Sequence, residues 1–136
     1  MISTNTSKTV VLVTNQFKCE RIIKAGKVLA DLSNTELSVL SVQSNEYPQN
    51  PEAINHLFDI STKSGAVMNV MYSENVERTI VHYIKEHKPV NVISGMPRQK
   101  NSILHKIWTR FTHITFFTVD EEGVLTEVTD RQNHLG

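Results

Sequence analysis

The sequence predicts a doubly wound α/β fold, with a largely parallel five-stranded sheet and helices on both faces. The first observation is that short β-branched apolar runs alternate along the chain with segments whose apolar residues recur every three or four positions. The second is that these runs are continuous, as in strands that helices cover on both sides. Strands that alternate with helices form right-handed βαβ units, and such units place their helices on both faces of a parallel sheet.

The first strand is predicted at residues 9–14 (TVVLVT), a β-branched run. Residues 19–32 then change to a helical period. The apolar residues that recur in this helix are Ile22, Ala25, Val28, Leu29 and Leu32. The second strand is predicted at residues 36–42 (ELSVLSV), and residues 43–50 form a polar connection to the next helix.

The second helix is predicted to begin at Pro51, because Asn50 is a favoured capping residue and proline suits the first helical position. The expected inner stripe consists of Ile54, Leu57, Phe58 and Ser61. Gly65 is expected to end this helix, because glycine adopts the left-handed conformation at low cost. Residues 66–72 (AVMNVMY) form the predicted third strand.

The third helix is predicted to begin after an Asn75 cap and to end before Pro89. Its inner face carries Val76, Ile80 and Ile84. The fourth strand is predicted at residues 90–93 (VNVI).

The last part of the chain contains a fourth helix and a fifth strand. The helical stripe consists of Ile103, Leu104, Ile107, Trp108 and Phe111. The strand is predicted at residues 114–119 (ITFFTV). Residues 121–123 (EEG) are suited to a turn, so residues 124–128 are expected to return as an extra antiparallel edge strand.

Composition restricts the class of protein. The 136 residues suffice for one domain, with flexible ends expected at residues 1–7 and 130–136. The 14 basic and 14 acidic residues balance, so nucleic acid and anionic membranes are not expected partners. Cys19 is the only cysteine, which excludes an intrachain disulfide and a cysteine zinc site. Without an apolar leader or a spanning apolar run, the chain is expected to be cytoplasmic and not inserted in a membrane.

In an open parallel sheet, ligands bind outside the carboxyl ends of the strands, here residues 15–18, 42–50, 73–75 and 94–102. These segments contain no Walker loop, dinucleotide fingerprint, nucleophile elbow or carboxylate cluster for magnesium. The six histidines show no zinc spacing, and Cys19 has no identifiable base partner. No catalytic or metal-binding residue is predicted, and the chain is expected not to be an enzyme.

Residues 94–102 (SGMPRQKNS) form the strongest candidate for a ligand loop. Gly95 permits a turn or the close approach of a ligand. Arg98 and Lys100 can donate to a phosphate, and Asn101 or Ser102 can cap the next helix. The next helix starts here, and the free N–H groups of a helix N-terminus also suit an anion. The alternative is a solvated loop before a helix with an ordinary charged face.

Three stretches resemble the universal stress protein family. The first is TVVLVTNQFKCERIIKAGKVLADL followed by ELSVLSVQ, which is similar to the strand, loop, helix and strand that open the family. The second is Gly65-Ala66 with the strand and helix after it, and the third is Val92-Ile93-Ser94-Gly95. The resemblance implies a UspA-like, adenine nucleotide alpha-hydrolase-like fold. The basic loop is also similar to that of the stress-protein domain in the sensor kinase of bacterial potassium uptake.

The resemblance further implies a nucleotide site, with ATP or AMP as the ligand. ATP-binding members carry a spaced glycine signature; Gly95 matches its first position, whereas Arg98 and Asn101 stand at later glycines and the spacing is too short. Asn15 stands where the family has an acid, and Val42 would offer its backbone to adenine. The implied nucleotide- or phosphate-binding residues are Thr14, Asn15, Val42, Gly95, Arg98, Lys100, Asn101 and Ser102.

Three functional hypotheses remain open at this point. The first is a universal-stress-type binding or signalling module with a degenerate nucleotide site. The second is a homodimeric protein-interaction module that binds no nucleotide, in which residues 114–119 or 124–128 pair with a second copy. The third is a weak nucleotide hydrolase or transferase, against which the missing glycines and carboxylates argue.

Overall fold

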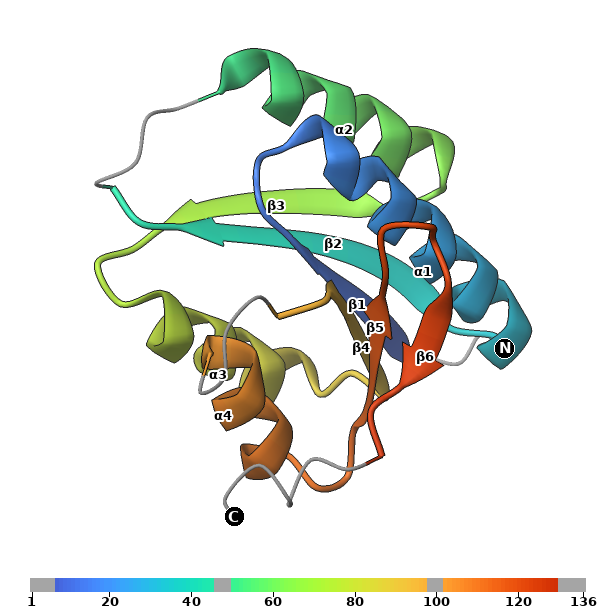
Figure 1. Ribbon diagram of the computed structural model, residues 1–136, viewed down its shortest axis with the longest axis vertical. Helices are drawn as coiled ribbons and strands as arrows, with labels where there is room; N and C mark the ends of the chain where they lie inside the picture. The colour runs from blue at the N-terminus through green and yellow to red at the C-terminus, as the bar shows by residue number, and fades with distance from the viewer. Residues whose placement is uncertain (1–6, 46–49, 98–101, 130–136) are drawn as a thin grey trace, which may run out of the picture.

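A six-stranded sheet with the order β3-β2-β1-β4-β5-β6 forms the centre of the molecule (Figure 1). The computed structural model describes residues 7–45, 50–97 and 102–129. Five strands run parallel: β1 (Lys8–Val13), β2 (Glu36–Gln43), β3 (Val67–Tyr72), β4 (Asn91–Gly95) and β5 (Thr115–Val119). The sixth, β6 (Leu125–Glu127), is antiparallel to β5. The predicted fold and its additional edge strand are confirmed.

The helices cover both faces of the sheet, as predicted (Figure 1). A short 3-10 turn, η1 (Phe17–Cys19), leads into α1 (Glu20–Ser33), which lies with α2 (Pro51–Lys63) on one face. The other face is covered by α3 (Val76–His87) and α4 (Ile103–Arg110). Alternate residues of each strand therefore enter two separate apolar cores, as the pleat of a strand requires.

The predicted helix caps are present. The Asn50 side chain accepts a hydrogen bond from Ala53 N (3.2 Å), and the Asn75 side chain accepts one from Arg78 N (3.0 Å). Gly65 follows α2 with a φ of 75°, the left-handed conformation expected of it. These local signals were sufficient because each depends on residues only a few positions apart.

The inner faces of two helices differ from the predicted stripes. In α1, Val28 and Leu32 are 57% and 80% exposed, and the helix instead turns Gly26 toward the sheet. A Cβ on Gly26 would overlap Val11 Cγ2, so this glycine lets α1 lie close against β1. In α2, Phe58 is exposed and Ala53 is buried in its stead. The spacing identified each helix, but the contacts with the sheet selected the face.

The fifth strand is not an edge of the sheet, which corrects one part of the homodimer hypothesis. Both sides of β5 are paired, with β4 on one side and β6 on the other. Within the described residues, the free edges belong to β3 and β6. The expected flexible ends lie outside the described residues, apart from Ser7.

Candidate functional site

The order in which the chain adds strands to the sheet reverses between the neighbouring strands β1 and β4. The chain proceeds from β1 through α1 to β2 on one side, and from β4 through α4 to β5 on the other. The two connections therefore separate at the carboxyl ends of these strands, and a crevice forms where they part. This is the position at which doubly wound folds bind their ligands.

A cavity of about 390 Å³ lies at this point. Its apolar wall comes from the strands and from the helices α3 and α4, and includes Leu12, Leu40, Val42, Ile80 and Leu104. Its polar lining comes mostly from the loop after β1, the start of α1 and the end of β4, and includes Thr14, Gln16, Lys18, Arg21, Ser94 and Glu121. The cavity is thus apolar on one side and polar, with two cations and one acid, on the other.

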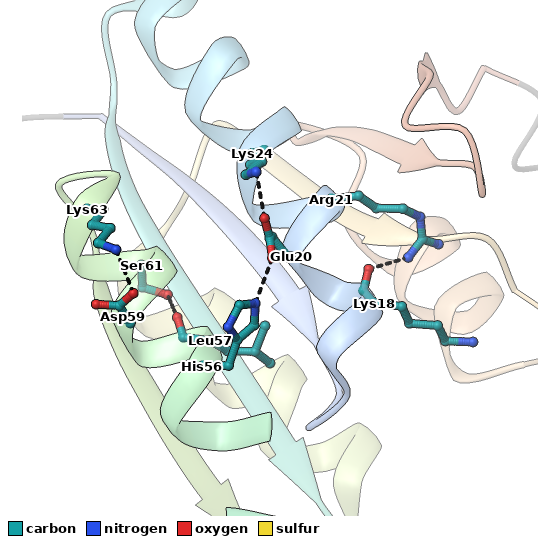
Figure 2. Close-up of polar contacts among 9 residues, drawn as sticks. All are labelled: Lys18, Glu20, Arg21, Lys24, His56, Leu57, Asp59, Ser61 and Lys63. Carbon is teal, nitrogen blue, oxygen red and sulfur yellow. Dashed lines mark hydrogen bonds and ion pairs between the residues drawn. The ribbon is translucent and has the colours of Figure 1, made fainter. Parts of the chain in front are cut away.

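Arg21 is the cavity cation with the most restricted position (Figure 2). Its Nη1 donates to the Lys18 carbonyl (2.7 Å) and its Nε donates to the Asp120 carbonyl (2.8 Å). Two hydrogen bonds from different nitrogens fix the plane of the guanidinium group. No carboxylate in residues 7–45, 50–97 or 102–129 forms an ion pair with it, so its charge is not neutralised there.

Gly95 is the last residue of β4 and lines the cavity next to Arg21. A Cβ at this position would lie 3.3 Å from Ile22 Cδ1 and 3.8 Å from Arg21 Nη2. The strand continues through Ser94 and Gly95, two residues beyond the predicted end. Gly95 therefore allows a close approach at the strand terminus and does not form the predicted turn.

Asn15 is buried, with 5% of its surface exposed, but it does not line the cavity. Its Oδ1 accepts a hydrogen bond from Ser41 Oγ (2.8 Å). Its Nδ2 is buried and has no hydrogen-bond partner among the described residues. A buried amide donor without a partner is unusual, because desolvating it costs free energy that no bond recovers.

Of the predicted site residues, Thr14, Val42 and Gly95 meet at the cavity. Ser102 caps α4, and its hydroxyl lies 3.0 Å from His105 Nδ1 in a capping box, outside the cavity lining. Arg98, Lys100 and Asn101 lie outside the described residues.

Arg21 was not among the predicted site residues. Its neighbours Cys19, Ile22 and Ile23 are all buried, which places a cation among residues that face the sheet. A cation in the first turn of the helix after β1 is a sequence signal for a binding residue at the carboxyl edge of the sheet. It identifies a cation near the carboxyl edge, but the contact with Asp120 lies 99 positions along the chain and cannot be inferred locally.

Other chemical groups near the cavity are already paired. Glu20 binds Lys24 Nζ (2.5 Å) and His56 Nε2 (2.6 Å) on the outer surface of α1 and α2 (Figure 2). The hydrogen bond from Lys24 and then that from His56 lower the pKa of the Glu20 carboxyl. The Cys19 thiol is buried and lies 3.5 Å from Thr14 Oγ1.

The described residues contain neither a cluster of metal ligands nor a membrane-spanning helix. In these, no three His, Cys, Asp or Glu side chains are grouped so that they could hold a metal ion. None of the helices in the described ranges has the length and apolar character needed to cross a membrane.

Comparisons with known proteins identify the fold. No protein-family model matches the chain, and neither does any curated protein sequence. The structure is similar to a universal stress protein in complex with cAMP, with a TM-score of 0.53 and 16% identity over 76% of this chain and 82% of that one. It is also similar to a universal stress protein family member from Burkholderia pseudomallei, with a TM-score of 0.57 and 14% identity over 83% and 96%. The chain has the universal stress protein fold, as the resemblance implied.

Proposed function

We propose that this chain is a non-catalytic binding module of the universal stress type, whose ligand is an adenine nucleotide held in the cavity between β1 and β4. The observation that carries the proposal is the cavity itself. It lies at the switch point of the sheet and has a volume of about 390 Å³, within the usual range for small-molecule sites. Its apolar wall suits a base, and its cationic side suits a phosphate.

The fold comparison adds support for the class of ligand. One protein with this fold forms a complex with cAMP. Because one fold serves many functions, the argument for this chain depends on the cavity and its residues. In the proposed complex, Val42 and Leu40 contact the base, and Thr14 and Gly95 border the ligand. Asn15, Arg98, Lys100, Asn101 and Ser102 stay proposed ligand residues on the grounds of sequence, with ATP or AMP as the first candidates.

The proposal does not include catalysis, because the described residues do not bring a nucleophile and a base together at the cavity. A nucleophile needs a base within hydrogen-bond reach. Cys19 lines the cavity, and its thiol lies 3.5 Å from the Thr14 hydroxyl, which is not a base at neutral pH. The Ser102–His105 pair serves as a helix cap. The hydrolase or transferase alternative therefore has no support from the described residues.

The test is thermal melting of the full chain with adenosine, AMP, cAMP, ADP and ATP. A ligand at 100 times its dissociation constant should stabilise the protein by about 2.7 kcal/mol, which raises the Tm by several degrees. Leu104→Trp should abolish the shift by filling the cavity. The matched control is Leu32→Trp, at an 80% exposed position that does not line it.

Two results would contradict the proposal. If no adenine ligand raises the Tm of the wild-type protein, the chain is not a nucleotide-binding module. If Leu104→Trp melts normally and keeps the full shift, the nucleotide binds somewhere else.

A second candidate function is the homodimeric interaction module, for which the β3 edge provides an observation. Residues 67–72 contain no charged side chain, and Val67, Met71 and Tyr72 are exposed. Edge strands without charges are the kind that pair with another chain. A dimer mass that does not change with concentration in light scattering would support this function, and a monomer mass would refute it.

A further inference from the structure

We propose that the Arg21 guanidinium group is the phosphate-binding group of this cavity and that it selects ligands with a single phosphate. This inference rests on the proposed function, since it concerns the same cavity. It assigns a ligand role to a residue on α1, whereas the sequence analysis selected the basic loop at residues 94–102.

The first argument is that Arg21 is held in place before any ligand binds. Its Nε donates to the Asp120 carbonyl oxygen, 2.8 Å away. Its Nη1 donates to the Lys18 carbonyl oxygen, 2.7 Å away, and Figure 2 shows this second bond. Carbonyl oxygens orient the group without cancelling its charge. Three of its five N–H donors, including both on Nη2, are not used by these two bonds. A guanidinium group with a fixed plane loses little entropy when it binds a ligand.

The second argument is that the local charge is not neutralised. Glu121 is the one acidic residue in the cavity lining, and it forms no ion pair with Arg21 or Lys18 among the described residues. Lys18 is exposed and offsets the charge of Glu121. Glu20, the acid next to Arg21 in sequence, is bound to Lys24 and His56 instead. An anion that enters the cavity therefore meets a net positive charge at Arg21.

The third argument is steric. Nη2 of Arg21 lies 3.8 Å from the position that a Cβ on Gly95 would occupy, so no side chain at position 95 covers this nitrogen. A phosphate placed there could accept two parallel N–H bonds, the geometry that arginine favours. The apolar wall at Leu40 and Val42 lies on the same cavity, so the base and the phosphate can be bound together.

The restriction to one phosphate follows from the number of fixed donors. Within the described lining, Arg21 is the single cation whose orientation is fixed by hydrogen bonds. A triphosphate carries several charged groups, and a single guanidinium group can form its paired N–H bonds with only one phosphate. AMP and cAMP should therefore bind at least as tightly as ATP.

The experiment is isothermal titration calorimetry of the full chain with adenosine, AMP, cAMP and ATP. In the wild-type protein, AMP should bind about 10 to 100 times more tightly than adenosine, the gain expected from charge-assisted hydrogen bonds. Arg21→Ala should lose this difference while keeping the affinity for adenosine. Arg21→Gln, which retains hydrogen-bonding capacity without the charge, guards against a folding defect in the alanine variant.

The matched control is Lys24→Ala, which removes an exposed cation one turn along α1 that does not line the cavity. It should leave the ratio between AMP and adenosine unchanged. If wild-type protein binds adenosine and AMP equally, or if both Arg21 variants keep the preference for AMP, the role of Arg21 is refuted while nucleotide binding stands. Tighter binding of ATP than of AMP refutes the single-phosphate restriction. If adenosine and all nucleotides fail to bind, the proposed function itself is refuted.

Discussion

The two ends of the parallel sheet differ in how far their buried polar side chains are hydrogen-bonded. At the amino end, Asn91 Nδ2 donates to Thr9 Oγ1 (3.0 Å) and Ser33 Oγ (3.2 Å), and the hydroxyl groups of Thr9 and Thr35 are 2.6 Å apart. At the carboxyl end, Asn15 Nδ2 is buried without a partner in the described residues. Among the described residues, the buried polar side chains at the amino end form a hydrogen-bonded network, whereas the Asn15 Nδ2 donor at the carboxyl end is unpaired.

This difference between the two ends indicates that the amino end contributes stability and that the carboxyl end is the site of ligand binding. Satisfied networks rigidify a protein, whereas an unsatisfied buried donor costs free energy and is retained for a reason. The unpaired donor lies at the carboxyl end of the sheet. The same end contains the cavity and Arg21, whose charge no described carboxylate neutralises. Stability should therefore be sensitive to substitutions at the amino end, and ligand binding to substitutions at the carboxyl end.

The largest effect is expected from Asn91→Ala. The side chain is 8% exposed and its Nδ2 makes two hydrogen bonds, so truncation should lower the free energy of unfolding by about 2 kcal/mol. Urea denaturation would measure this as a lower midpoint with an unchanged slope. Nucleotide affinity should stay at the wild-type value. A loss below about 0.5 kcal/mol would show that the amino-end network is not a source of stability.

A smaller effect is expected from Asn15→Ala, the corresponding change at the carboxyl end. It removes one hydrogen bond, with Ser41, but also the unpaired Nδ2, so the loss should be about 1 kcal/mol or less. Adding Ser41→Ala should recover part of that loss, because no buried hydroxyl is then left alone. The same urea titration serves both variants. A loss as large as that of Asn91→Ala would mean that Nδ2 has a partner in the folded protein.

The smallest effect concerns Glu20, on the surface above the cavity. Its pKa is lowered from the ordinary 4.5, mainly by the hydrogen bond from Lys24 and then by that from His56. Because the folded-state pKa is the lower one, its stabilisation is present above pH 4.5 and is lost as the pH falls through the folded-state value. Glu20→Gln should therefore reduce stability at pH 7 by about 0.5 kcal/mol or less, since the pair is solvent-exposed.

The measurement for Glu20 is the difference in unfolding free energy between wild type and variant as the pH is lowered. The difference should shrink toward zero under acidic conditions. Glu122→Gln is the control, since Glu122 has no ion pair in the described part of the chain. A Glu20→Gln difference that is constant with pH would show that the ion pairs with Lys24 and His56 do not contribute.

The site could be predicted only in part. The carboxyl ends of β1 and β4 were identified because every parallel sheet has its crevice there, and Thr14, Val42 and Gly95 do line the cavity. Asn15 lies at the predicted strand end, but its side chain accepts a hydrogen bond from Ser41 and does not face the cavity. The sequence could not predict this orientation, because Ser41 is 26 positions away. Arg21 was missed because a cation in the first turn of a helix is ordinarily a solvent-exposed residue.

By itself, the sequence determined the order of strands and helices, their parallel arrangement and the caps at Asn50 and Asn75, because periodicity and capping depend on residues one or two turns apart. Only the tertiary structure decided which face of α1 is buried and that Arg21 reaches the carbonyl of Asp120. These features depend on contacts between distant segments, which form only when the sheet has assembled. The functional site belongs to this second group, since a cavity is enclosed by elements that local sequence does not bring together.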